Sequence, residues 1–279
     1  MRISSLLASA ALAATLAVLA SPASATPFTW NPSATSGSAL SNATAFTASN
    51  ITINDYAVID VANPAIVTES AILSVQNFNV ATPGLVNNSG IAQNGANPYA
   101  LYFTVTATSH LAPSGPGLFG SFDTLTYTLW GDVGGNCTFS ASASGPAKSC
   151  GGDTQLALVT GSLSTLGTNQ VSIVNGIPSA AVDVTIANGA NAGNFWVSPS
   201  LLSAFQFETS FTNTLQEITT SGTKFIIGAA TGCGVNQDQP CPGGGTIDLV
   251  PIPEPVTLSI FGAGLAGAAA MRRRKAKKA

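Results

Sequence analysis

The side chains that could carry out chemistry are few and lie far apart in the chain. His110 is the only histidine among the 279 residues, so a Ser-His-Asp hydrolase would have a single candidate base. No G-x-S-x-G motif occurs, and therefore no nucleophile elbow is predicted. His110 follows a strand-like segment, and we interpret it as an exposed loop histidine.

The acidic residues offer two further possibilities, and neither has a supporting motif. Paired carboxylates could hydrolyse glycosides if Glu69, Glu208, Glu217 and several aspartates converged in the fold. Spacing in the sequence does not test this convergence, and no motif favours it. Asp132 and Asn136 carry oxygen ligands that suit calcium, yet the full EF-hand pattern is absent, which favours a simple turn. No P-loop, dinucleotide or metal motif is present. We therefore predict no catalytic residue, no metal, no cofactor and no enzymatic activity.

Four cysteines form two local pairs, Cys137 with Cys150 and Cys233 with Cys241. An even number in an exported chain predicts disulfides, and four cysteines allow three connectivities. The two local pairs are favoured because each would close a glycine-rich loop. Zinc is the alternative, but there is no C-x-x-C spacing and His110 is distant.

Charge is distributed unevenly along the chain. Between residues 26 and 252 there are eleven acidic residues and only two basic ones, Lys148 and Lys224. Such a body cannot form the basic surface that neutralises phosphates, so nucleic acid is excluded as a partner.

The N-terminus has the three parts of a secretory signal peptide. Arg2 precedes an uncharged apolar run over residues 6–20, and Ala23-Ser24-Ala25 supplies an A-x-A exit. This pattern predicts cleavage after Ala25, which leaves Thr26 as the first mature residue. The apolar run is shorter than the roughly 20 residues that a spanning helix needs. The alternative, a buried or membrane helix, is therefore not favoured.

The C-terminus predicts a single membrane helix over residues 256–270, which carry no charge. Its length is close to the lower limit for a span, about 17 residues. A basic cluster follows and should remain cytoplasmic, so the body would lie on the other side of the membrane. This stop-transfer cluster contains Arg272, Arg273, Arg274, Lys275, Lys277 and Lys278.

Between the two ends the sequence alternates with a period of two, which predicts strands. Leu101, Phe103 and Val105 alternate with Tyr102, Thr104 and Thr106, as the residues of half-buried antiparallel strands do. The 28 glycines and 16 prolines punctuate these segments. Long loops are expected over residues 86–97 and 111–120, and a stiff linker over residues 240–245 and 251–253. The strand candidates are residues 51–61, 66–80, 101–108, 124–129, 156–163, 182–186, 205–212 and 224–227.

These patterns predict an all-β protein, an antiparallel β-sandwich-like extracellular body with a C-terminal single transmembrane helix. The expected divisions are a signal peptide over residues 1–25, a β-rich body over residues 26–250, and a C-terminal segment over residues 251–279.

The C-terminal segment closely resembles the PEP-CTERM sorting signal. Pro253-Glu254-Pro255, the apolar run and the basic cluster occur in the order found in that family. The resemblance implies processing near Glu254 by an exosortase, a membrane enzyme of Gram-negative bacteria that make exopolysaccharide. The product would be secreted or held at the cell surface after transient anchoring in the inner membrane.

The body is similar to flocculation-associated PEP-CTERM proteins. The similar segments are residues 28–33, 46–52, 99–104 and 125–130, which read FTWNPS, FTASNIT, YALYFT and LTYTLW. The resemblance implies a role in flocculation or biofilm formation with extracellular polysaccharide as partner. We therefore expect a non-enzymatic surface or matrix protein. The alternative is a carbohydrate-binding module or polysaccharide-acting enzyme that uses the same sorting route.

Overall fold

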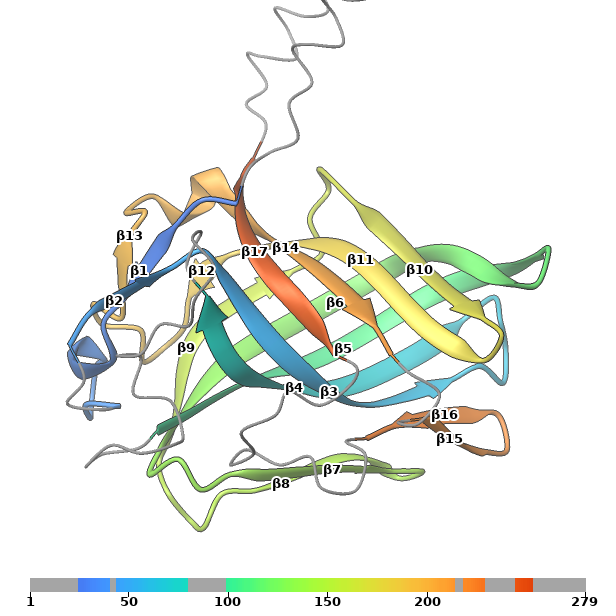
Figure 1. The fold of residues 1–279 in the computed structure, drawn as a ribbon, viewed down its shortest axis with the longest axis horizontal. Helices are drawn as coiled ribbons and strands as arrows, with labels where there is room; N and C mark the ends of the chain where they lie inside the picture. The colour runs from blue at the N-terminus through green and yellow to red at the C-terminus, as the bar shows by residue number, and fades with distance from the viewer. Residues whose placement is uncertain (1–24, 41–43, 80–98, 214–217, 229–243, 253–279) are drawn as a thin grey trace, which may run out of the picture.

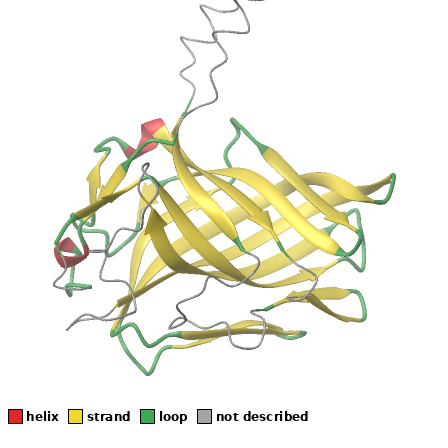
Figure 2. Ribbon diagram, in the orientation of Figure 1, coloured by secondary structure: helices red, strands yellow, loops and turns green. Residues whose placement is uncertain are grey.

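A computed structural model describes residues 25–40, 44–79, 99–213, 218–228 and 244–252 (Figure 1). Strands and their connections dominate these residues (Figure 2). The helical elements among them are two 3₁₀ turns, η1 (Pro32–Ala34) and η2 (Leu202–Ala204). The all-β prediction is confirmed.

Eight antiparallel strands form a sheet that closes on itself. Neighbours pair in the order β10-β11-β14-β17-β3-β4-β5-β6, and β6 then pairs with β10. The bounds are β10 (Asn169–Val174), β11 (Ile177–Thr185), β14 (Phe205–Thr212), β17 (Gly245–Pro251), β3 (Asn50–Asp60), β4 (Val67–Asn79), β5 (Tyr99–Ser114) and β6 (Gly117–Val133).

The closed sheet is the main difference from the sandwich-like arrangement expected. β6 has 17 residues and pairs with β10 near its beginning and with β9 (Gln155–Ser162) near its end. Because twisted strands of this length coil, the two edges of one sheet can meet. Opposite sides of the same sheet therefore enclose the core, where a sandwich would use two separate sheets.

Shorter strands extend or accompany the closed sheet. β12 (Ala187–Asn188) continues the sheet from β9, and the hairpin of β15 (Ile218–Ser221) and β16 (Lys224–Ile227) pairs with β3. β7 (Thr138–Ser142) and β8 (Gly145–Ser149) form a separate hairpin. A small sheet has the order β13-β1-β2, with β13 (Trp196–Ser198), β1 (Phe28–Trp30) and β2 (Phe46–Ala48).

Every predicted strand segment overlaps an observed strand, but one predicted loop is wrong. Residues 111–120 were expected as a loop, whereas β5 continues to Ser114 and β6 begins at Gly117. Gly115 has φ +55°, which a tight hairpin turn requires and which glycine adopts without strain. The glycines and prolines there mark a turn between two long strands. The predicted loop over residues 86–97 lies outside the described residues.

The alternating residues separate the inside of the closed sheet from its outside. On β5, Leu101, Phe103 and Ala107 are buried, whereas Thr104 and Thr106 face outward. Because successive side chains point to opposite faces of a strand, this period-two pattern fills the core and leaves hydroxyls on the surface.

An aromatic cluster joins the small sheet to the core. Trp30 is completely buried, with ring centroids 5.0 Å from Phe195, 5.1 Å from Phe78 and 5.7 Å from Trp196. Trp196 lies 6.0 Å from Phe207, which points into the closed sheet. The rings therefore fill one end of the interior with apolar surface.

The two ends of the body meet beside this cluster. The Thr26 N–H donates a hydrogen bond of 2.6 Å to the Leu249 carbonyl of β17. The first residue of the predicted mature chain thus lies beside the strand that precedes the C-terminal segment (Figure 1).

Candidate functional site

A groove of about 520 Å³ crosses the outer face of β6, β10, β11 and β14. The register of the strands places the side chains of this groove side by side. Ser172 of β10 lies opposite Phe119 of β6 and opposite Ser179 of β11. Ser179 in turn lies opposite Thr212. The Phe119 side chain remains 42% exposed, which leaves an aromatic ring available beside a row of hydroxyls. The groove therefore combines polar groups with an apolar face.

The polar side chains of the groove have no hydrogen-bond partner among the described residues. These side chains are Gln170, Ser172, Ser179, Ser210 and Thr212. The threonines on β5 and β6 differ, because Thr106 and Thr126 hydroxyls bond each other at 2.9 Å, and Thr108 and Thr124 at 2.7 Å. The groove hydroxyls are free to bind a ligand, whereas these paired threonines already satisfy one another.

A row of carboxylates lies beside the groove on the same outer face. Glu208 of β14 is opposite Asp183 of β11 and Asp248 of β17. Burial, and in addition the charge of Glu208, raises the pKa of both aspartates. Asp183 is covered by the chain at Thr168, whose N–H donates to Oδ2 at 2.6 Å. This part of the surface is unfavourable for anions.

Both described lysines are already engaged elsewhere. Lys148 donates to the Tyr102 hydroxyl and lies 4.5 Å from the centre of that ring. Lys224 donates to the Ala143 carbonyl at 2.9 Å. An anionic ligand would therefore find no free ammonium group within the described part of the chain.

Cys137 and Cys150 form a disulfide, as predicted for the first local pair. It joins the two ends of the β7–β8 hairpin, and Phe139 of this hairpin packs against Tyr56 and Tyr102. The predicted pair Cys233 and Cys241 lies outside the described residues.

The segment from Asp132 to Asn136, which was considered as a calcium site, contains a turn. Asp132 is completely buried, and its Oδ2 accepts a hydrogen bond from the Asn136 N–H at 3.1 Å. The Asn136 amide donates to Asp153 at 2.6 Å. These contacts stabilise the turn internally, which agrees with the turn interpretation.

His110 lies within β5, and it contacts two groups of β6. Its Nδ1 is 2.7 Å from the Asp123 carboxylate, and its Nε2 is 3.4 Å from the Ser121 hydroxyl. The side chains of His110 and Asp123 are 55% and 48% exposed, so water competes for both contacts. The prediction of exposure agrees with the structure, although the residue belongs to a strand. We assign no catalytic role to this arrangement.

The carboxylates considered for glycoside hydrolysis do not converge in the described structure. Glu69 points into the interior of the closed sheet, whereas Glu208 is exposed on the outer face. Glu217 lies outside the described residues. Burial raises the pKa of Glu69 to about 7, from an ordinary value of 4.5.

Folding stability should depend on this buried carboxyl. Because the folded state holds the Glu69 proton more tightly, stability should fall as the pH rises from 4.5 to about 7. Glu69→Gln should therefore raise the free energy of unfolding by about 2 kcal/mol at pH 8. This is less than a fully enclosed carboxyl would give, because the Glu69 side chain is half-buried and water screens part of its charge. Urea denaturation at pH 5 and pH 8 measures this, and the gain should be much smaller at pH 5. An equal effect at both pH values would contradict burial of the charge.

The predicted processing residues lie mostly outside the described part of the chain. Ala23 belongs to the undescribed N-terminal residues, and the Pro253-Glu254-Pro255 motif, the apolar run and the basic cluster follow the last described residue. Residues 251–275 match the family described as PEP-CTERM protein-sorting motif. The chain carries a PEP-CTERM sorting motif. It is therefore an exported, cell-surface-directed protein, and the motif implies processing by an exosortase.

The match covers the C-terminal segment, so it does not test the resemblance of the body to flocculation-associated proteins. No curated protein and no solved structure matches this chain. Within the described residues, the chain has no helix with the length and apolar character of a membrane span. The predicted span over residues 256–270 falls outside those residues and stays a prediction, as do the signal cleavage site and the domain boundaries.

The groove was not predicted from the sequence, because it depends on the pairing of β6 with β10, which closes the sheet and joins strands far apart in the chain. β10 was not predicted as a strand, although Asn175-Gly176 is a strong hairpin signal. Both residues have positive φ, 52° and 78°, as the turn between β10 and β11 requires. This dipeptide would have located the hairpin, but not its contact with β6.

Proposed function

We propose that this PEP-CTERM protein is a non-enzymatic matrix protein that binds extracellular polysaccharide and promotes flocculation or biofilm formation. The groove carries the proposal, because free hydroxyl and amide groups there lie beside the exposed ring of Phe119. Sugars present hydroxyls for hydrogen bonds and apolar ring faces for contact with aromatic rings. The groove offers both kinds of contact on one outer face.

The polysaccharide that suits this surface is neutral. The neighbouring carboxylates Asp183, Glu208 and Asp248 repel anions, and both described lysines are engaged. An anionic polymer would therefore gain no ion pair and would meet like charges. Hydrogen bonds and ring contacts remain as the source of affinity.

The sorting motif supports delivery of this surface to the matrix. In a Gram-negative host, residues 256–270 would anchor the exported chain transiently in the inner membrane, with the basic cluster in the cytoplasm. Exosortase processing at the Pro-Glu-Pro motif would then separate the body from this anchor.

Polysaccharide binding tests the proposal directly. Phe119→Ala should weaken binding of the processed protein to its host's exopolysaccharide by about three- to tenfold, through loss of the ring contact. Co-sedimentation with the purified polymer gives the affinity. Ile66→Ala is the matched control, because Ile66 is 61% exposed and lies outside the groove. Equal binding by both variants and the wild type would exclude the groove as the site.

Flocculation in the native host tests the cellular role. Cells of a deletion strain should disperse while they still make polysaccharide. The wild-type gene should restore aggregation fully, and the Phe119→Ala gene should restore it only in part. Normal aggregation of the deletion strain would contradict the matrix role. Polysaccharide binding that persisted in that case would favour a carbohydrate-binding module with another purpose.

A further inference from the structure

The two predicted membrane segments join the body at the same end. Ile252, the last described residue, donates its N–H to the Ala204 carbonyl at 2.9 Å, and the predicted span begins at residue 256. The predicted signal peptide ends just before Thr26, whose N–H is bonded to Leu249 of β17. We call the small sheet β13-β1-β2, η2 and the last residues of β17 the exit end of the body (Figure 1).

The exit end exposes apolar side chains. Leu201, which directly precedes η2, is 64% exposed, and Val197 of β13 is 46% exposed. Leu201 is the most exposed large apolar side chain among the described residues. Between them in sequence, the Pro199 carbonyl accepts a hydrogen bond of 2.8 Å from the half-buried Trp196 indole. Apolar surface therefore lies beside the point from which the chain continues toward the predicted span.

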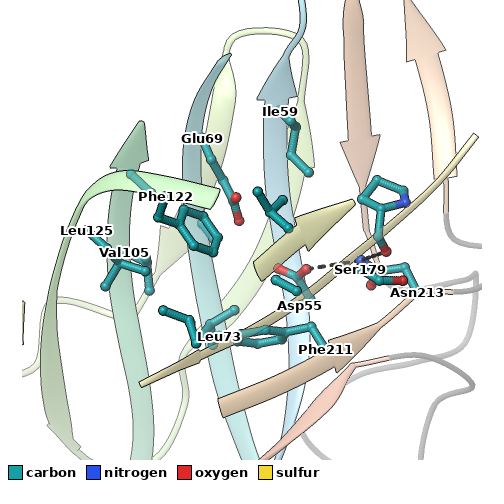
Figure 3. Close-up of a pocket in the computed structure, with 16 residues that line it drawn as sticks. Asp55, Ile59, Glu69, Leu73, Val105, Phe122, Leu125, Ser179, Phe211 and Asn213 are labelled. Carbon is teal, nitrogen blue, oxygen red and sulfur yellow. Dashed lines mark hydrogen bonds between the residues drawn. The ribbon is translucent and has the colours of Figure 1, made fainter. Parts of the chain in front are cut away.

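The exit end also carries no charge. No acidic or basic residue occurs over residues 26–54 or 184–207, although the body as a whole is acidic. The carboxyl of Asp55 points into the interior cavity of the closed sheet (Figure 3). Glu208 and Asp248 lie opposite each other in the fourth pair from the end of the β14–β17 ladder. An uncharged surface can approach lipid without the cost of removing a charge from water.

The linker is too short to hold the exit end far from a bilayer. Four residue steps separate Ile252 from Val256, and an extended chain spans at most about 14 Å over that length. The interfacial layer on each side of a bilayer is about 5–8 Å thick. When residues 256–270 span the membrane, Ile252 must therefore lie within roughly 9 Å of the headgroup surface. Leu201 lies near the same surface, because Ile252 is bonded to Ala204 three residues further on.

We propose that the exit end docks on the membrane surface before processing, with Leu201 and Val197 inserted into the interfacial region of the bilayer. The inference rests on the anchoring step of the proposed function and adds a second membrane contact to it. Burial of apolar surface drives the docking, since the exit end has no cation with which to bind anionic lipid. Because the Pro-Glu-Pro motif lies between the docked end and the span, docking would also keep this motif at the membrane surface.

Quenching of tryptophan fluorescence by lipid tests the docking. The exported precursor would be reconstituted in phosphatidylcholine vesicles whose acyl chains carry bromine near the headgroup, and flotation would show that it is anchored. In Leu201→Trp the emission of the added tryptophan should fall by about half or more, because the ring would lie in the interfacial region. Sodium chloride should not reduce this quenching, since no ion pair is involved.

Ile66→Trp provides the matched control. Ile66 is 61% exposed, which is similar to Leu201. It follows the end of β3 at Asp60, whereas β17 pairs with the other end of β3, from Asn50 to Ile53. The emission of a tryptophan added at position 66 should therefore be the same in brominated and ordinary vesicles.

A second substitution shows whether apolar insertion causes the contact. Val197→Asp in the Leu201→Trp precursor should lower the equilibrium constant for docking, obtained from the quenching, about tenfold, because a buried apolar side chain is lost. Ile66→Asp in the same precursor should leave the quenching unchanged. Leu201 and Val197 are exposed, so these variants should keep the thermal unfolding midpoint of the wild type.

The outcomes separate the docking from the anchoring. Equal quenching of Leu201→Trp and Ile66→Trp, or quenching of neither in a precursor that floats with the vesicles, would overturn the docking and leave the anchoring intact. A precursor that did not float would overturn both. Shielding of Leu201→Trp in native membranes but not in lipid vesicles would assign this surface to the processing enzyme, against docking on lipid.

Discussion

Trp30→Ala should lower the free energy of unfolding by about 4 kcal/mol, within the range for removal of a large buried aromatic side chain. Trp30 is completely buried, and five aromatic rings surround it at centroid distances from 4.9 to 6.5 Å. Several of these rings belong to different segments of the chain, so the cavity left by alanine cannot close through one local movement. Urea denaturation followed by circular dichroism measures the loss.

Trp30→Phe provides the matched control. The indole Nε1–H is buried without a hydrogen-bond partner among the described residues, and phenylalanine removes this unsatisfied donor while it keeps an aromatic ring. The cost should therefore be about 1 kcal/mol, because relief of the unpaired donor offsets part of the lost contact. An equal loss of unfolding free energy in Trp30→Ala and Trp30→Phe would contradict this account, because it would show that an aromatic ring at position 30 does not stabilise the cluster.

Glu254→Ala should block removal of the C-terminal segment and leave the precursor in the membrane of the native host. Glu254 is the one charged residue of the Pro-Glu-Pro motif, and residues 251–275 match the sorting family. Loss of one charge-assisted hydrogen bond to the processing enzyme should slow cleavage about tenfold or more. Intact-mass measurement distinguishes the two forms, because cleavage near Glu254 would remove the basic cluster and the apolar run together.

Asp248→Asn is the control for this experiment. Asp248 lies on β17, a few residues before the motif, and its substitution also removes one negative charge. This variant should be processed as the wild type is. Normal processing of Glu254→Ala would contradict the role of the motif, whereas failure of both variants would point to a general effect of charge near the cleavage site.

Strand positions in the body were predictable because they depend on local alternation. On β5, Leu101 and Phe103 are buried while Thr104 and Thr106 face outward, as the period-two pattern requires. The pairing of Cys137 with Cys150 was also predictable, since the two cysteines are only 13 residues apart and the β7–β8 hairpin lies between them. These features involve residues close together in sequence.

The contacts between segments far apart in sequence were not predictable in the same way. Ser172 lies opposite Phe119 only because β10 pairs with β6, although 53 residues separate the two positions in sequence. Asp55 and Asn213 approach each other across 158 residues, with Nδ2 and Oδ2 3.5 Å apart. Alternation shows which face a residue occupies on its own strand, but it contains no information on which strands are neighbours.

The sequence by itself determined the class of the protein, the local strands, the scarcity of catalytic groups and the sorting motif at residues 251–275. Each of these depends on composition or on a short pattern, and its physical meaning is local. Only the tertiary structure decided that one sheet closes on itself, that its outer face carries a groove beside Phe119, and that Glu69 points into the interior. The closure of a sheet depends on the coiling of all its strands together, which no short segment of sequence contains. The alternation of apolar and polar residues along one strand is the same in a sandwich as in a closed sheet.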